Sequence, residues 1–108
     1  GGSIEGITPP ALLLASLGSC VAVYLERYLN GAKIKFSKFS IKVKSDIGKE
    51  SPRYLKNIEV RIDIQDLRLV PKRKEALLEF IKNCPVHNTL KYNPVVDIIL
   101  VAPSRKPR

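Results

Sequence analysis

The longest apolar stretch of the chain, residues 7–31, predicts one buried helix. Apolar side chains would occupy nearly every face of this helix, which is typical of a core helix rather than an amphipathic surface helix. Thr8 is a suitable N-cap, the two prolines after it suit a first helical turn, and Asn30 and Gly31 provide a C-terminal stop. Because prolines and polar residues interrupt the apolar run, we do not expect this helix to span a membrane.

Two segments after this helix alternate between apolar and polar residues at the period of a half-buried strand. The first strand covers residues 39–44, and residues 34–36 alternate in the opposite register, which predicts a bulge or bend at residues 37–38. A loop rich in turn-forming residues follows at 46–52, and the second strand covers 55–65. Opposite charges on the outer faces of the two strands favour an antiparallel hairpin.

The last third of the chain predicts a second helix and a third strand. Residues 71–84 form an amphipathic helix that Pro85 ends or kinks, and residues 86–90 add a short helical turn. The segment 95–102 is nearly continuously apolar, which indicates a strand that is covered on both faces or packed in an interface. We expect the basic tail from Pro103 onwards to be loose.

The order helix, strand, strand, helix, strand predicts an α+β fold whose helices lie on one side of an antiparallel sheet. The length of 108 residues fits a single domain, residues 1–108. Three strands are too few to cover the first helix, so we expect a second sheet or a second subunit to cover it. A partner helix is expected along a stripe of small residues on the first helix. This stripe consists of Ala11, Ala15, Gly18 and Ala22.

Composition narrows the classes of function. The formal net charge of +9 suggests a nucleic-acid partner, but the basic residues are dispersed and no aromatic residues alternate with them, which favours a solvated basic surface. Two cysteines without a CxxC motif and a single histidine do not predict a metal site, and no cofactor is expected. The sequence shows no secretory signal, so we expect a cytoplasmic protein with free thiols.

The two cysteines are the candidates for chemistry, although a buried cysteine is most often a small core residue. Cys20 has Ser16 and Ser19 in the preceding turn, so its surroundings are not purely aliphatic. Cys84 ends a helix beside a proline, and His87 could orient or deprotonate a thiol. The alternative for His87 is a solvent-facing residue at a helix end. The residues alone leave both interpretations open.

The segment PPALLLASLGSCVA, followed 64 positions later by CPVHNTL and then by VVDIILV, resembles the osmotically inducible protein C and organic hydroperoxide resistance superfamily. The resemblance extends over residues 8–101. It implies a two-layer α+β fold, with an antiparallel sheet packed on a long central helix, and an intertwined homodimer with sites at the subunit interface. It also implies a thiol-dependent peroxidase that reduces organic hydroperoxides and is reset by an external dithiol. By resemblance Cys20 is the peroxidatic cysteine and Cys84 the resolving cysteine.

The resemblance also directs attention to a substrate pocket and to two departures from the family pattern. Helical spacing from the cysteines suggests an apolar pocket for a lipid-like hydroperoxide. The residues expected to line it are Leu13, Leu17, Tyr24 and Phe80. Pro10 stands where the family's peroxidases commonly carry an acidic residue, and the family arginine comes from an N-terminal strand segment that we expect this chain to lack. The alternative function is a non-enzymatic relative that binds an apolar ligand in the dimer crevice.

Overall fold

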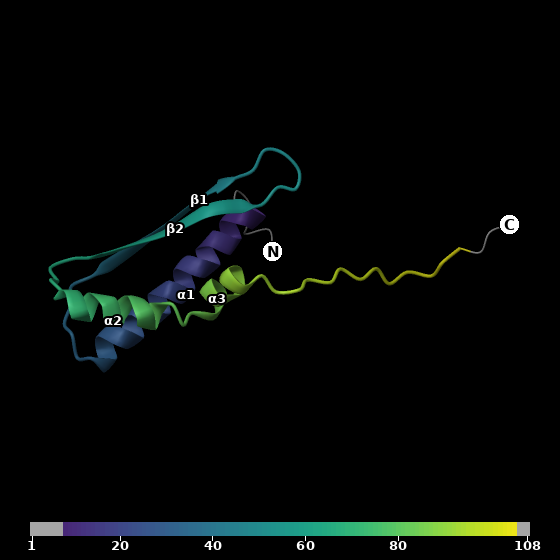
Figure 1. Ribbon diagram of the computed structural model, residues 1–108. Coiled ribbons are helices and arrows are strands. Elements are labelled where there is room, and N and C mark those ends of the chain that lie inside the picture. The colour runs from purple at the N-terminus through teal and green to yellow at the C-terminus, as the bar shows by residue number, and fades with distance from the viewer. Residues whose placement is uncertain (1–7, 106–108) are drawn as a thin grey trace.

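The computed structural model describes residues 8–105 and confirms the α+β class (Figure 1). Three helices and a two-stranded antiparallel sheet follow one another along the chain. In order they are α1 (Pro9–Gly31), β1 (Phe39–Ile47), β2 (Leu55–Ile64), α2 (Pro71–Ile81) and α3 (Pro85–Tyr92).

Both ends of α1 form where local signals predict them. The side chain of Thr8 accepts a hydrogen bond from the backbone N–H of Ala11 at 3.2 Å, which caps the first turn. At the other end, the N–H of Ala32 donates to the carbonyl of Tyr28 at 2.9 Å and closes the last turn. A 23-residue helix rises about 1.5 Å per residue, so α1 runs the length of the folded body.

The β1–β2 hairpin has the predicted antiparallel pairing, with Phe39 opposite Ile64 and Val43 opposite Val60. The predicted bend is present at Ser37, just before β1, and the pairing has a further irregularity between Lys44 and Asp46. The alternating residues 34–36 are not part of the strand, because the chain first turns tightly after α1: Lys33 has a φ of 57° and the N–H of Ile34 bonds back to α1.

The predicted charge complementarity between the strands is present at two cross-strand pairs, Lys44 with Glu59 and Asp46 with Lys56, of which the first forms an ion pair. Lys44 lies opposite Glu59 with an N–O distance of 3.3 Å, whereas Lys42 lies opposite Arg61, a pair of like charge. Arg61 instead reaches Glu59 on its own strand at 3.0 Å. Hydrogen bonds from Arg61 and Lys44 hold the pKa of the Glu59 carboxyl below its ordinary value.

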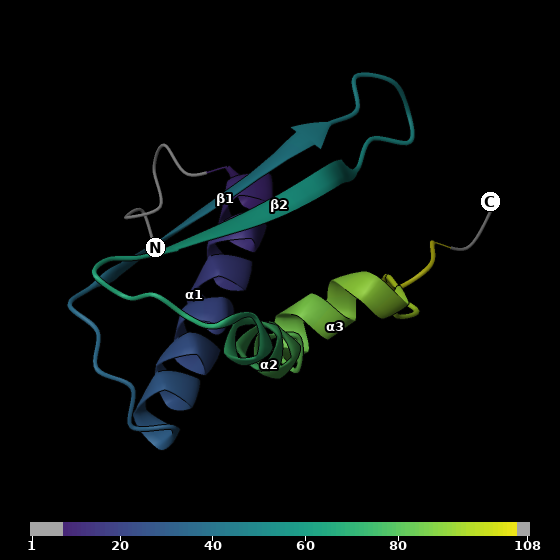
Figure 2. The same ribbon diagram turned by 60° about the vertical axis from the view of Figure 1, so that its left-hand side comes forward.

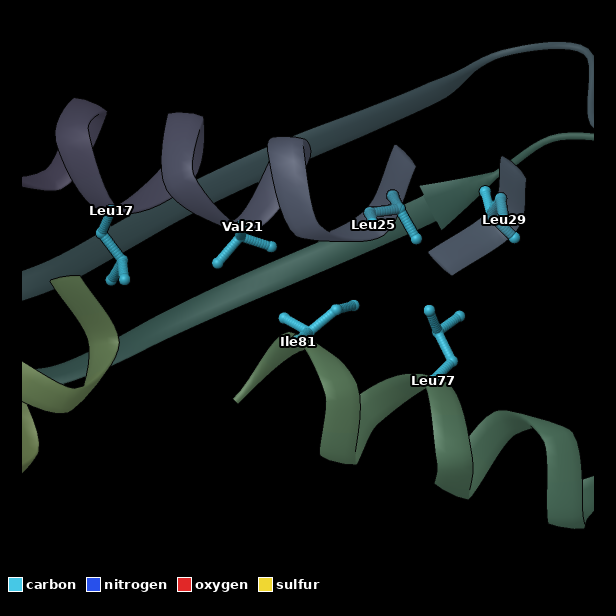
Figure 3. Packing of buried hydrophobic residues seen from close by; sticks show 6 residues of the cluster. All are labelled: Leu17, Val21, Leu25, Leu29, Leu77 and Ile81. Atoms are coloured by element: carbon cyan, nitrogen blue, oxygen red, sulfur yellow. The ribbon is translucent and has the colours of Figure 1, made fainter. Parts of the chain in front are cut away.

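The core forms where α1 meets α2 and the inner face of the hairpin. Figure 3 shows four side chains of α1 pointing toward two side chains of α2. These six buried residues are Leu17, Val21, Leu25, Leu29, Leu77 and Ile81. Figure 2 shows the hairpin crossing α1, with α2 and α3 following one another beside α1. By length and composition α1 would also suit a membrane span, but these contacts use it as the central helix of the fold.

The buried face of α1 is narrower than the composition of the helix predicts. One stripe of the helix is buried, whereas Leu12, Leu13 and Val23 remain 41–48% exposed. The expectation of burial on nearly every face is therefore wrong for one chain by itself, because a two-stranded hairpin and α2 cover only part of its circumference.

The predicted strand at 95–102 is absent from this chain. Beyond Asn93, whose φ of 46° ends α3 in a left-handed conformation, the backbone extends away from the body (Figure 1). The apolar side chains from Val95 to Val101 are 76–95% exposed. A strand requires a neighbour for its backbone hydrogen bonds, and β1 and β2 pair only with each other.

Within this chain, strand β1 approaches the small-residue stripe of α1 at Gly18, and the partner helix expected along the stripe stays a prediction. A Cβ added at Gly18 would lie 3.1 Å from a methyl group of Val43 on β1. Beside this contact an open groove of about 500 Å³ follows the rest of the stripe. The absence of a side chain at residue 18 thus sets how closely the sheet packs on α1.

Replacing Gly18 by valine is expected to destabilise the protein by about 1–3 kcal/mol, because the added side chain must push Val43 and β1 away from α1. Urea unfolding of Gly18→Val measures the free energy. Gly31→Ala is the matched control, since a Cβ at residue 31 meets nothing within 4 Å. Equal midpoints for the two variants would contradict the close approach.

Candidate redox site

The two cysteines, 64 residues apart in sequence, are joined in a disulfide. Their Cα atoms lie 6.1 Å apart, inside the range of about 4.4–6.8 Å that a disulfide requires. Cys20 belongs to the middle of α1, and Cys84 lies in the connection between α2 and α3. The fold therefore brings together both residues that the sequence singled out for chemistry.

Cys84 is placed by the break between two helices. The predicted helix over 71–84 ends earlier, at Ile81, because Pro85 cannot continue it and instead begins α3. The N–H of Cys84 donates to the carbonyl of Ile81 at 3.0 Å, and its own carbonyl accepts from the N–H of Asn88 at 3.0 Å. Cys84 is thus the N-cap residue of α3 and is held from both sides.

The two sulfur-bearing residues differ in exposure. Cys84 is completely buried, whereas Cys20 is partly exposed. A reagent that arrives from solvent therefore meets Cys20 first. Since thiol–disulfide exchange depends on which sulfur can be attacked, this asymmetry distinguishes the two positions chemically.

Two of the predicted pocket residues, Tyr24 and Phe80, contact each other. Tyr24 follows Cys20 by one helical turn and Phe80 precedes Cys84 by four residues, and their ring centroids are 5.8 Å apart. Tyr28 extends this aromatic group, with its ring centroid 5.5 Å from that of Phe80. The three rings thus form one aromatic cluster between α1 and α2.

The other two predicted pocket residues lie apart from this cluster. Leu17 is 3% exposed and belongs to the core between α1 and α2. Leu13 is 41% exposed and lines a different cleft, near the first turn of α1. The four residues share the face of α1 and α2 that helical spacing predicts, but they do not enclose one cavity.

His87 lies in the first turn of α3, and its ring contacts residues close to it in sequence. Its Nδ1 atom is 3.2 Å from the carbonyl oxygen of Lys82 and 3.2 Å from Oδ1 of Asn88. A proton on Nδ1 would be donated to these oxygens and would leave Nε2 as the basic nitrogen. A role for His87 in orienting a thiol stays a prediction.

Sequence patterns did not indicate the cleft that contains Leu13. Its polar lining includes Arg53 and Tyr54, from the irregular loop between β1 and β2, where no periodicity marks a residue as facing inward. The sequence predicted only that turn-forming residues make a loop here. Within residues 8–105, no three histidine, cysteine or acidic side chains cluster as metal ligands would.

Three solved structures share this fold. An osmotic stress induced and detoxification response protein from Psychrobacter arcticus is 21% identical with a TM-score of 0.69, and the match covers 79% of this chain and 61% of that one. A hypothetical protein from Aquifex aeolicus is 23% identical with a TM-score of 0.69, and the match covers 82% of this chain and 67% of that one. The organic hydroperoxide resistance protein OsmC from Legionella pneumophila is 20% identical with a TM-score of 0.64, and the match covers 80% of this chain and 63% of that one. The chain thus spans about two thirds of their length.

The comparison with curated proteins finds no match. The model of the OsmC-like protein family, in contrast, matches residues 1–99, which is nearly the whole chain and includes both cysteines. The matched range contains the helix with Cys20, the hairpin, and Cys84 between α2 and α3. This chain belongs to the OsmC-like protein family.

Proposed function

We propose that this protein is a thiol-dependent peroxidase that reduces organic hydroperoxides through Cys20 and Cys84. The observation that carries the proposal is the disulfide itself, which joins a partly exposed cysteine to a fully buried one. Two core cysteines without a redox role have no requirement to meet within bonding distance. The similar fold of a protein described as an organic hydroperoxide resistance protein supports the same chemistry.

The exposed position of Cys20 suits it to the peroxidatic role. Its thiolate attacks the O–O bond of a hydroperoxide, which releases an alcohol and leaves a sulfenic acid on the sulfur after one proton is taken up. The thiol of Cys84 then condenses with this sulfenic acid, so that a disulfide forms and water leaves. A helix N-terminus, where Cys84 sits, favours negative charge on the sulfur that must act as nucleophile here and as leaving group later.

The reduced state is regenerated by an external dithiol. One thiolate of the dithiol attacks the accessible sulfur of Cys20, which releases Cys84, and the second thiol of the reductant then displaces Cys20. No metal or cofactor takes part in these steps. We place the protein in the cytoplasm, where dithiol reductants keep thiols reduced.

We further propose that the working form is a homodimer. The chain exposes 9406 Å² of surface, whereas a folded monomer of its mass exposes about 6,000 Å². Its radius of gyration of 19.2 Å likewise exceeds the value of about 13 Å for a compact domain of 100 residues. The exposed apolar segment 95–101 contributes to both excesses, and a second copy that pairs with it would cover this surface.

A thiol titration of the full-length protein tests the redox proposal. The reduced protein is expected to lose both thiols within seconds of adding one equivalent of cumene hydroperoxide, and to recover both after treatment with a dithiol. This measurement of free thiols requires no knowledge of the natural reductant. Two thiols that persist would overturn the peroxidase and favour the ligand-binding relative, whose cysteines are structural.

A further inference from the structure

A cleft of about 570 Å³ opens at the end of the molecule where α1 begins. It lies between the first turn of α1, the loop that joins β1 to β2, and the end of α3. Its walls are mostly apolar. They include Pro10, Leu13, Leu55, Ile58 and Leu90. Its volume is within the range of about 300–1,000 Å³ that is typical of small-molecule sites.

This cleft is separate from the redox site. Leu13 precedes Cys20 by seven residues, which is about 10 Å along a helix. Leu17, which is 3% exposed, fills the intervening turn of α1. Three large apolar or aromatic residues of the cleft remain open to solvent, with exposures of 41% for Leu13, 44% for Ile47 and 59% for Tyr54. The redox chemistry gives no reason for this exposure.

The polar side of the cleft carries a fixed positive charge. Arg53 donates from Nε to the carbonyl of Gly48 at 2.9 Å, which holds its side chain against the hairpin loop. No carboxylate of residues 8–105 forms an ion pair with its guanidinium group, so the terminal nitrogens can bind another anion. Nearby, the Lys56 ammonium lies 5.2 Å from the centroid of the Tyr54 ring and adds to the positive potential.

The helix end at the cleft offers little competing recognition of anions. Pro9 and Pro10 have no backbone N–H, and the N–H of Ala11 is already bonded to Thr8. The α1 N-terminus therefore contributes only its favourable dipole, and Arg53 is the cationic hydrogen-bond donor among the residues that line the cleft. A guanidinium group matches a carboxylate with two parallel hydrogen bonds.

We propose that this cleft binds an amphiphilic monocarboxylate, with the alkyl chain along Leu13 and Leu90 and the carboxylate on Arg53. The apolar walls provide most of the buried surface, and the Arg53 guanidinium group fixes the direction in which the ligand lies. This site goes beyond the proposed peroxidase, because neither cysteine belongs to it.

Binding of dodecanoate and of its methyl ester to the full-length protein, measured by calorimetry below the micelle concentration, tests the proposal. The wild type is expected to prefer the acid to the ester about tenfold, which corresponds to one charge-assisted hydrogen-bonded contact. Arg53→Gln should remove this preference by weakening only the acid. Leu13→Asn should weaken both ligands, and Arg68→Gln, in the loop after β2, should change neither.

Three results would overturn the site: no binding of dodecanoate, equal affinity for acid and ester, or unchanged affinity in Arg53→Gln or Leu13→Asn. Because residue 13 is 41% exposed, its substitution leaves the core intact, and thermal melting of each variant checks the fold. Cys20→Ser should bind dodecanoate like the wild type. That result separates the two proposals, because a failed thiol titration would leave this binding unaffected.

Discussion

Cys20→Ser is expected to consume no organic hydroperoxide, because a serine hydroxyl cannot replace a thiolate as the nucleophile that attacks an O–O bond. Serine is close to cysteine in size, and residue 20 is only partly buried, so the fold should tolerate the change. Peroxide remaining after mixing, measured by ferrous oxidation with xylenol orange, reports the loss. The rate should fall by several orders of magnitude to that of buffer.

Cys84→Ser is expected to separate the two halves of the reaction. Its Cys20 can still form a sulfenic acid, but no neighbouring thiol condenses with it. Without added reductant this variant should consume one equivalent of hydroperoxide and then stop. Dimedone, which reacts with sulfenic acids, should label Cys20 in this variant and not in the oxidised wild type, and mass spectrometry of the digested protein locates the label.

The controls follow from the burial of each sulfur. Residue 84 is completely buried, so a serine there leaves a polar group in the core, and Cys84→Ala provides the same test without that cost. Melting curves of the reduced proteins confirm that each variant is folded. Peroxide consumption by Cys20→Ser at the wild-type rate would contradict the assignment, as would dimedone labelling of a residue other than Cys20.

Local signals predicted most of the fold. The Thr8 cap, the residue alternation of the hairpin, and the proline at position 71 mark elements that form from interactions within a few residues or between adjacent strands. Boundaries that depend on geometry were less accurate. The end of α2 was predicted three residues late, because Cys84 continues the apolar spacing of the helix although Pro85 forces the break earlier.

The site was predictable only in part. The pairing of Cys20 and Cys84 was predicted from the resemblance to a family, because the periodicity of the two helices does not indicate that residues 64 positions apart meet. The cleft around Arg53 was not predicted, because loop residues face inward or outward according to the tertiary fold. The prediction of a strand at residues 95–102 was wrong for another reason. Its composition is typical of a buried strand, but one chain provides no neighbouring strand for it.

Ile99→Lys, in the exposed segment 95–101, is expected to convert the proposed dimer into monomers. In one chain this side chain is 79% exposed, so a lysine there costs the monomer almost nothing. Burying an isoleucine against a partner contributes about 1.5–3 kcal/mol. A twofold dimer contains the substitution twice, so the dissociation constant should rise about a hundredfold to ten-thousandfold.

Light scattering after size exclusion, over a dilution series, measures the mass of the particle. Val70→Lys is the matched control, because Val70 is also apolar and 67% exposed but lies in the connection before α2, away from the segment. Wild type and control should elute as dimers at concentrations where Ile99→Lys is monomeric. If all three proteins keep the same mass on dilution, a second copy does not cover residues 95–101, and their apolar surface must meet a different partner.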